Sequence, residues 1–219
     1  MDYRDLINRV LRRMREDTID SDWSGDLQDD TSVTDDYQKL IGDFVNEAKV
    51  EVEDAWNWTQ LRSTEDVTTS NGTTTYTMPN HTDRSRILYV FDDTNDNKLM
   101  QISDAQFENY QFIGTTQVGV PAYYRLIGND ISFWPTPAGT YDIKITTVIP
   151  QAELSDATTE LTVPDQPVIL KAYALAIEER GEDGGTTGDK AELKADKALS
   201  DAISQDSLRT VDETVWHAS

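Results

Sequence analysis

Residues 50–62 read VEVEDAWNWTQLR and lie where the periodicity of the sequence changes. Upstream of them, apolar residues recur with the period of about 3.6 residues that marks one face of an amphipathic helix. This stripe consists of Tyr37, Leu40, Ile41, Phe44, Val45, Ala48, Val52, Ala55 and Trp56. On an ideal helix Trp58 lies about 200° from Trp56, so we expect the helix to end near Asn57. Trp56 and Trp58 are then predicted to turn inward and form a structural junction.

After Ser63 the period falls to two, and Thr, Val, Tyr and Ile become frequent, which indicates β-strands. Asn71-Gly72 separates TEDVTTS from TTTYTMP and predicts a first hairpin. Further hairpins are expected where DDTNDN separates RILYVF from KLMQIS, and where Gly128-Asn129-Asp130 separates YYRLIG from ISFWP. The stretch DAQFENYQF is expected to form a short helical or irregular crossing, and TYDIKITTVIP a last strand. Six or so strands over 63–150 suggest a small sandwich or an open barrel.

Helical patterns flank this β region on both sides. Residues 2–16 predict a first amphipathic helix, and Thr34-Asp35-Asp36 offers an N-cap for the long second one. A third helix has Pro167 in its first turn and stops at Gly181, and a fourth runs over 189–204. The predicted fold class is α+β, a bundle of about four helices with an inserted antiparallel β-sandwich or barrel-like domain. The expected domains are residues 1–62 with 151–206, residues 63–150, and a C-terminal arm at 207–219.

The charge of the chain restricts the classes of function. Forty-one acidic against nineteen basic residues give a net charge of −22. Such a surface repels phosphate, so tight nucleic-acid binding across the whole molecule is excluded. The chain has no cysteine, which removes disulfides, thiolate metal sites and cysteine nucleophiles. No signal peptide and no membrane-spanning run is recognised, and we expect a soluble protein of intracellular origin.

The predicted first helix, unlike the chain as a whole, contains more basic than acidic residues. From Asp17 to Asp66 there are fifteen acids and three bases, whereas the preceding residues contain a cluster of arginines. Arg9, Arg12 and Arg13 form its centre. Two interpretations stay open, an ordinary solvated helix face or a docking surface for an acidic partner, such as a neighbouring subunit.

No catalytic, cofactor or metal site is predicted. The two histidines, His81 and His217, are poorly placed for a buried general base. Residues 181–190, GEDGGTTGDK, superficially resemble a phosphate loop, but their acids oppose phosphate and no strand precedes them. Asp93, Asn95 and Asn97 match part of a calcium-loop pattern. However, Lys98 stands where that loop needs glycine, so a plain turn is predicted.

A resemblance to a known family rests on the order of four features. These are the helix ending in VNEAKVEVEDAWNWTQLR, a β insertion with Gly119, Pro121, Tyr123 and Tyr124, the run FWPTPAGTY, and the returning helix VPDQPVILKAYALAIEERGE. Together they resemble the head-to-tail adaptor (connector) proteins of tailed bacteriophages, the group that includes tail tubular protein A of short-tailed phages. The resemblance covers roughly residues 35–205.

The resemblance implies a structural role in the virion neck. Members of the family form dodecameric rings between the portal protein and the tail nozzle, tube or fibre proteins, and genomic DNA passes through without specific binding. Their helical bundle builds the ring, and a C-terminal arm reaches the portal. Here that arm would carry the docking residues Val211, Val215 and Trp216. The chain would be made in the host cytoplasm, need no cofactor and contact no membrane.

A binding module is the competing interpretation. In it, the β region is a carbohydrate- or receptor-recognising sandwich carried by helices. Aromatic side chains would supply the stacking faces, although core packing would also explain most of them. The candidates are Tyr76, Tyr89, Tyr110, Tyr123, Tyr124 and Trp134.

Overall fold

The structure is a computed structural model, which describes residues 1–19, 23, 25–28, 33, 35–78, 80–112, 117–181 and 186–209. The chain divides into two compact units. The helical unit comprises residues 1–61 and 151–219, and the β unit comprises residues 62–150. The α+β fold class is confirmed, because helices make up one unit and a mostly antiparallel, nearly barrel-shaped sheet dominates the other.

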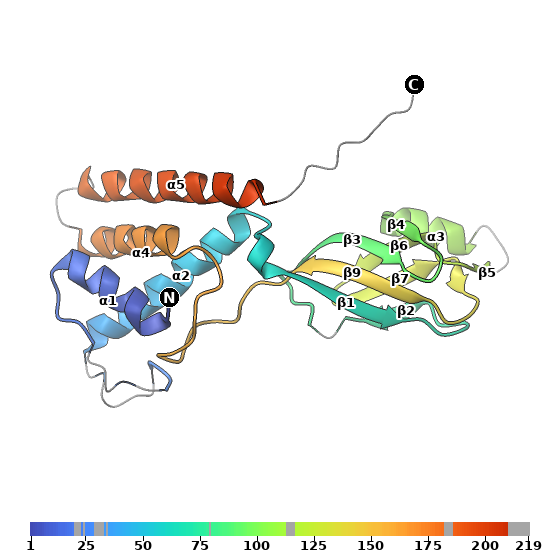
Figure 1. The fold of residues 1–219 in the computed structure, drawn as a ribbon, viewed down its shortest axis with the longest axis horizontal. Coiled ribbons are helices and arrows are strands. Elements are labelled where there is room, and N and C mark those ends of the chain that lie inside the picture. Colours follow the sequence, from blue (N-terminus) through green and yellow to red (C-terminus); the bar gives the residue numbers. More distant parts are fainter. Residues whose placement is uncertain are drawn as a thin grey trace, which may run out of the picture. The chain divides into compact units, whose positions relative to one another are not determined.

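Four helices build the helical unit (Figure 1): α1 (Tyr3–Met14), α2 (Asp36–Ala55), α4 (Asp165–Arg180) and α5 (Thr186–Ser207). Helix α4 is central, since it packs against each of the other three. The apolar faces predicted for α1, α2 and α4 form the core. Its main members are Leu6, Ile7, Val10, Leu11, Ile41, Val45, Val52, Val168, Ile169, Ala172 and Ala176.

The helix ends follow the capping signals of the sequence. Helix α1 is capped by Asp2, whose carboxylate accepts from the backbone N–H of Asp5 at 2.7 Å, and α2 is capped by Asp35. Helix α4 ends at Gly181, which adopts the left-handed conformation (φ 62°) that glycine permits at low cost. The bundle of about four helices is thus present, with α5 starting and ending about three residues outside its predicted range.

Two buried asparagines hold irregular backbone against the helices. Asn8 accepts from the N–H of Ile19 at 2.7 Å and donates to its carbonyl oxygen at 3.0 Å. Asn46 likewise accepts from the N–H of Leu154 and donates to its carbonyl oxygen, both at 2.9 Å. Each amide pairs like a neighbouring β-strand residue, which satisfies backbone groups that burial would otherwise leave without partners.

The β unit contains one seven-stranded sheet, in the order β1-β9-β3-β4-β6-β7-β2, and a two-stranded parallel ladder of β5 and β8. The strands are β1 (Arg62–Thr68), β2 (Thr75–Thr77), β3 (Arg86–Asp92), β4 (Asn97–Gln101), β5 (Val118–Gly119), β6 (Tyr123–Ile127), β7 (Asp130–Trp134), β8 (Thr136–Pro137) and β9 (Asp142–Val148). The predicted hairpins β3–β4 and β6–β7 are confirmed by their antiparallel registers.

The predicted hairpin at Asn71-Gly72 is wrong. A turn does form there, with the N–H of Thr73 donating to Ser70 O at 3.2 Å, but β1 pairs with β9 and β2 pairs with β7. Turn residues fix a local bend, whereas strand pairing depends on which distant strands share an apolar inner face. The two strands around this turn therefore lie at opposite edges of the sheet order.

This short link requires the sheet to curl. The chain from Thr68 to Thr75 spans at most about 25 Å when extended. In a flat sheet of seven strands, at about 4.8 Å spacing, the edges would be about 29 Å apart. Two backbone hydrogen bonds of 2.9 Å hold the link against the sheet: Thr69 N–H donates to Tyr141 O, and Phe133 N–H donates to Thr74 O. The inner face thereby closes around one apolar cluster: Val67, Met78, Val90, Leu99, Tyr124, Ile131, Phe133, Ile143 and Ile145.

Within the seven-stranded sheet, one described strand pair departs from the antiparallel expectation. Strands β4 and β6 are parallel, and a parallel pair needs a crossover rather than a tight turn. Helix α3 (Asp104–Phe112), predicted as a short helical crossing, provides it. The Arg125 guanidinium of β6 lies 4.0 Å from the Phe107 ring of α3 and binds Glu108 at 2.6 Å. Helix α3 therefore covers the outer face of β6.

Candidate functional site

The turn that follows α2 brings Trp56 and Trp58 into different environments. Trp58 is buried, and its indole N–H donates to Val52 O at 2.7 Å, satisfying a carbonyl near the helix end. Trp56 is half-buried and donates to Asp206 Oδ2 at 3.2 Å. Asp206 also accepts from the N–H and the hydroxyl of Thr59. The end of α5 is thus fastened to the turn by one buried carboxylate.

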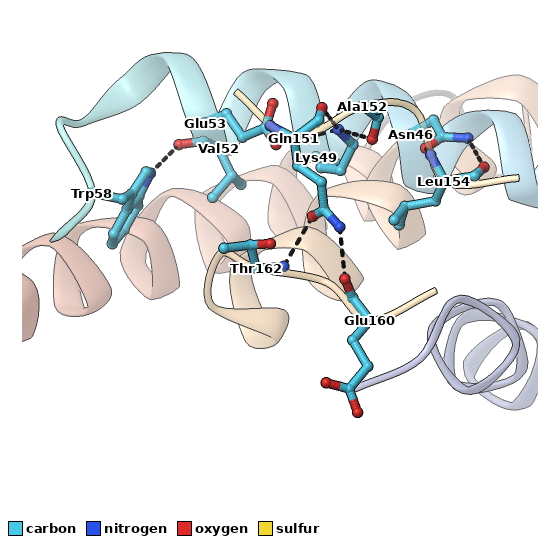
Figure 2. A network of polar contacts seen from close by, with 10 residues as sticks. All are labelled: Asn46, Lys49, Val52, Glu53, Trp58, Gln151, Ala152, Leu154, Glu160 and Thr162. Carbon is cyan, nitrogen blue, oxygen red and sulfur yellow. Dashed lines mark hydrogen bonds and ion pairs between the residues drawn. The ribbon is translucent and has the colours of Figure 1, made fainter. Parts of the chain in front are cut away.

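A polar stripe along α2 holds the chain where it returns from the β unit (Figure 2). The Lys49 ammonium donates to the carbonyl oxygens of Gln151 at 2.7 Å and Ala152 at 3.1 Å, and lies 3.2 Å from Glu53 Oε1. Glu53 in turn accepts from the N–H of Gln151 at 3.2 Å. Both charged side chains are almost fully buried. Because each charge has an opposite partner and further hydrogen bonds, the pair can remain ionised inside the unit.

The returning segment is also braced internally. The Gln151 side chain donates to Glu160 O at 2.7 Å and accepts from the N–H of Thr162 at 3.0 Å, as Figure 2 shows. Sequence reasoning missed this network and Asp206. A Lys-Glu pair four residues apart is typical of a solvated helix face, so the only available signal was its position beside the apolar stripe. The two connections between the units are therefore fixed on the helical side by buried polar groups.

The predicted basic patch lies on the surface. Arg9, Arg12 and Arg13 are exposed on α1, and the Arg13 guanidinium lies 6.0 Å from the Tyr173 ring of α4. No ion pair is recorded for these three arginines in the described part of the chain. The solvated-face interpretation fits these observations, and the docking interpretation stays a prediction.

Helix α5 joins the bundle through small residues and one cation. Ala191 and Ala195 are its buried apolar side chains, and Leu193 is 68% exposed. Lys171 of α4 bridges Glu51 of α2, at 2.9 Å, and Glu192 of α5. Burial lowers the pKa of Lys171, but hydrogen bonds and charge interactions with the two carboxylates outweigh it, so the pKa lies above its ordinary value. The predicted docking residues Val211, Val215 and Trp216 lie outside the described residues.

The β unit carries a group of large apolar and aromatic side chains on its outer face. Met100, Tyr123 and Trp134 occupy paired positions on the adjacent strands β4, β6 and β7. They face outward because side chains alternate along strands and the neighbouring residues Leu99, Tyr124 and Phe133 belong to the inner cluster. Tyr110 of α3 stacks on Trp134 with ring centroids 4.5 Å apart. These four side chains are termed the aromatic surface: Met100, Tyr110, Tyr123 and Trp134.

A cleft of about 230 Å³ opens beside Tyr110 and Trp134. Among the described residues no charged side chain lines it, and its remaining lining residues are Thr74, Gln111, Gln117 and Thr136. Of the binding-module candidates, Tyr110, Tyr123 and Trp134 gather here, Tyr124 belongs to the inner cluster, and Tyr89 lies apart on β3. The Tyr76 hydroxyl is engaged by the turn at Ser70 and Thr73.

The remaining chemical candidates behave as structural groups. Around the calcium-like pattern, Asp92 accepts from Thr94 N and from the backbone and side chain of Asn95. Asp93 instead pairs with Lys144 at 2.9 Å. Within the described ranges, no three His, Cys, Asp or Glu side chains are arranged to hold a metal ion. None of the helices in those ranges is long and apolar enough to cross a membrane.

Comparison with known proteins supplies the family. A family model described as SU10 adaptor protein matches residues 1–216, nearly the whole chain. No curated protein matches the sequence. The expected resemblance to phage head-to-tail adaptors is confirmed, whereas a specific likeness to tail tubular protein A stays a prediction. A bundle with a β insertion, whose buried polar groups serve structure, is consistent with a structural role. The chain belongs to the SU10 adaptor protein family, a family of phage head-to-tail adaptors.

Proposed function

We propose that this chain is the repeating subunit of a ring, of twelve copies, that joins the portal protein to the tail of a phage particle. The family match over residues 1–216 carries the proposal. In this role the helical unit builds the ring, the Trp56–Trp58 turn connects it to the β unit, and the arm at 207–219 docks on the portal. The tail nozzle, tube or fibre protein binds on the opposite side. The protein acts as a structural part rather than an enzyme.

The distribution of charge supports a channel for DNA. The β unit has ten acidic and six basic residues, a net charge of −4, so the helical unit carries −18 of the total −22. If the ring is built by the helical unit, most of the negative charge surrounds the passage. Acidic walls repel phosphate and give no counterion-release gain, so DNA slides through without specific binding. Screening over about 8 Å limits this effect to carboxylates that line the passage.

Subunits of equal charge need specific contacts to stay together. We assign one such contact to the exposed arginines Arg9 and Arg12 of α1, which would meet the acidic surface of the next subunit. A ring contact joins two different faces, so a basic face on one copy and an acidic face on its neighbour fit that geometry. Replacing both arginines by glutamate should shift assembly toward single subunits at low salt in analytical ultracentrifugation. Unchanged assembly would remove this contact from the proposal.

Quantitative mass spectrometry of purified particles tests the function itself. The ratio of this chain to the portal protein should be close to one, as expected when two rings of matching subunit number meet. Absence of the chain from particles would overturn the adaptor proposal. The channel part has a separate test. Replacing exposed carboxylates of the helical unit by amides, in groups, should slow DNA ejection while leaving assembly intact, and unchanged ejection rates would refute it.

A further inference from the structure

We propose that the helical unit has a basic face on α1 and α5 that binds the acidic side of α2 in a second copy of this chain. The inference rests on the proposed function, since it names the surfaces through which neighbouring ring subunits would meet. The basic face is defined by six exposed cations, three from each helix: Arg9, Arg12, Arg13, Lys190, Lys194 and Lys197.

Helix α4 holds the two parts of the basic face together. Figure 1 shows α4 between α1 and α5, and it packs against both. Met14 of α1 and Tyr173 of α4 pack against a cluster that includes Ala191 of α5. The Arg13 guanidinium lies 6.0 Å from the Tyr173 ring. Lys190 precedes Ala191 in the sequence, so the cations of α1 and α5 flank the same stretch of α4.

The three lysines of α5 point away from α2. At 100° per residue on an ideal helix, they lie within about 60° of one another. They also lie about 140–160° around the helix from Glu192. The Glu192 carboxylate marks the side of α5 that is directed toward α2, because Lys171 of α4 bridges it to Glu51 of α2.

The arginines of α1 also point away from α2. Arg12 lies about 180° around α1 from Tyr3, and Arg9 and Arg13 lie within about 100° of Arg12. The Tyr3 hydroxyl accepts from the side-chain amide of Asn46 on α2 at 3.1 Å, which places α2 on the opposite side of α1. Six cations share these helix stripes with two exposed acids, so the basic face has an excess of four positive charges. The two acids are Asp5 and Asp201.

The exposed side of α2 and the loops beside it carry the opposite charge. On α2, three exposed carboxylates recur at helical spacing, and one of them, Asp43, lines a hollow of about 490 Å³ together with two more. Lys39, a cation on the same side, already donates to Gln28 O at 2.8 Å. The five carboxylates are Asp26, Asp36, Asp43, Glu47 and Glu153.

Opposite charges on two sides of one unit fit the contact between neighbours in a ring. Such a contact joins two different faces of each subunit, and the basic face and the acidic side of α2 are two different faces. The helical unit carries a net charge of −18, so two copies repel each other unless the contact brings opposite charges together. DNA is a weaker candidate for the basic face, because the net charge of −22 on the whole chain repels phosphate.

Charge reversal in phage particles tests the pairing. Lys194→Glu with Lys197→Glu should lower the number of chains per portal subunit about tenfold or more, since like charges would meet across the contact. Adding Asp43→Lys and Glu47→Lys to the same chain should restore the native ratio, because both faces then exchange sign. The matched control is Lys98→Glu, at an exposed position of β4 in the β unit, and its particles should keep the native ratio.

A cross-linking experiment reports the contact without changing the charge pattern so strongly. The chain has no cysteine, so introduced thiols react alone. With Lys194→Cys and Glu47→Cys in one chain, a bismaleimide should produce covalent multimers larger than dimers in particles. Either substitution alone should produce none, because the contact joins two different faces.

The outcomes separate this inference from the proposed function. A native ratio in the Lys194→Glu, Lys197→Glu particles would overturn the inference, as would a lowered ratio that Asp43→Lys and Glu47→Lys do not restore. Absence of multimers from the double-cysteine chain would also overturn it. So would dimers from Lys194→Cys alone, which indicate a two-fold contact, or cross-links to the portal protein. Retention of duplex DNA by the native chain, lost on charge reversal, would assign the basic face to phosphate instead.

The native particle is the reference for these measurements. A ratio close to one chain per portal subunit, combined with any of the contrary results, overturns the inference and leaves the proposed function intact. Absence of the native chain from particles would refute the proposed function itself.

Discussion

The two units of this chain stabilise their structures in opposite ways. The helical unit carries a net charge of −18 and buries ionised and amide groups, notably Lys49, Glu53 and Asp206, in hydrogen-bonded networks. The β unit carries −4 and closes around an apolar cluster, yet leaves large hydrophobic side chains exposed on its outer face. The helical unit thus carries most of the net charge and pairs the polar groups that it buries, whereas the β unit exposes large apolar side chains on its outer face.

This difference indicates that the surfaces of the two units would associate with other molecules through different forces. A highly charged surface needs specific, satisfied contacts to associate with copies of itself, whereas an uncharged aromatic surface binds by burying area. The buried networks of the helical unit fix the two chain crossings without relying on the β unit.

Trp58→Ala should have the largest effect on stability. Removing this buried ring leaves a cavity and removes the indole hydrogen bond to Val52 O, at a cost of about 3–5 kcal/mol. Trp134→Ala, on the half-buried outer face of the β unit, should cost less than about 2 kcal/mol. Urea denaturation followed by circular dichroism at 222 nm measures the loss in the helical unit, and hydrogen exchange of β-unit peptides over the same urea series measures the loss in the β unit. Equal losses for the two variants would contradict the contrast between a buried junction and a contact surface.

Lys49→Met should cost about 3–5 kcal/mol, because it leaves the Glu53 carboxylate buried without its cation. The matched control is Lys197→Met on α5, where the side chain is exposed and the expected change is within about 0.5 kcal/mol. Both values come from the same denaturation experiment. If Lys49→Met is as mild as the control, the network does not hold the returning segment.

Gly42→Ala should destabilise the helical unit by about 1–3 kcal/mol despite the better helix propensity of alanine. An added Cβ would lie 2.2 Å from Leu27 Cδ2 and 2.7 Å from Tyr3 Oη. Gly188→Ala on α5 is the control, since its nearest neighbour would be 4.0 Å away, at Ile177 Cγ2. This change should stabilise by about 0.5–1 kcal/mol. Thermal unfolding of both variants distinguishes them by the sign of the shift in Tm.

Stability should fall at alkaline pH, and part of that fall belongs to Tyr3. Burial, followed by the negative charges of Asp43, Glu153 and Asp26, raises the pKa of Tyr3 above its ordinary value. The folded state thus retains the phenol proton longer than the unfolded state. The resulting stabilisation is complete below about pH 10 and decreases as the pH rises further. Tyr3→Phe should show a shallower decrease than the native chain between about pH 10 and pH 11 in urea titrations. Parallel curves would assign the decrease to other groups, such as Lys171.

Raising the salt concentration should change the two units to different extents, and this is the smallest of the expected effects. Screening relieves repulsion among like charges, so raising the salt concentration should slow hydrogen exchange more in α2 and α5 than in β3 and β9. Peptide-resolved hydrogen–deuterium exchange at low and high salt measures both units in one sample. A larger response in the β unit would contradict the assignment of charge repulsion to the helical unit.

Several features were predictable because they depend on neighbouring residues. Helical periodicity located α1, α2 and α4, Asp35 belonged to the predicted N-cap of α2, and Gly181 predicted the end of α4. The hairpins β3–β4 and β6–β7 followed from their turns. The predicted end of α2 near Asn57 agrees with its last helical residue, Ala55, since only two residues separate them.

The candidate surfaces were predictable only in part. The sequence identified the aromatic residues of the β region, but it could not separate the inward Tyr124 from the outward Tyr123, because alternation gives two faces without saying which is buried. It also identified the arginines of α1 but not the burial of Lys49 and Glu53. Their burial depends on a segment about one hundred residues later in the chain.

The sequence by itself determined the helices, the turns, the strong negative charge and the family. These properties come from local periodicity, short-range hydrogen bonding and composition, all of which are present in the linear chain. The tertiary structure decided that β1 pairs with β9 and β2 with β7, at opposite ends of the strand order of one curled sheet. It also decided that α2 holds the returning segment through Asn46, Lys49 and Glu53, and that the aromatic surface faces outward. Each of these depends on contacts between distant residues, whose free energy is set by which faces become buried together.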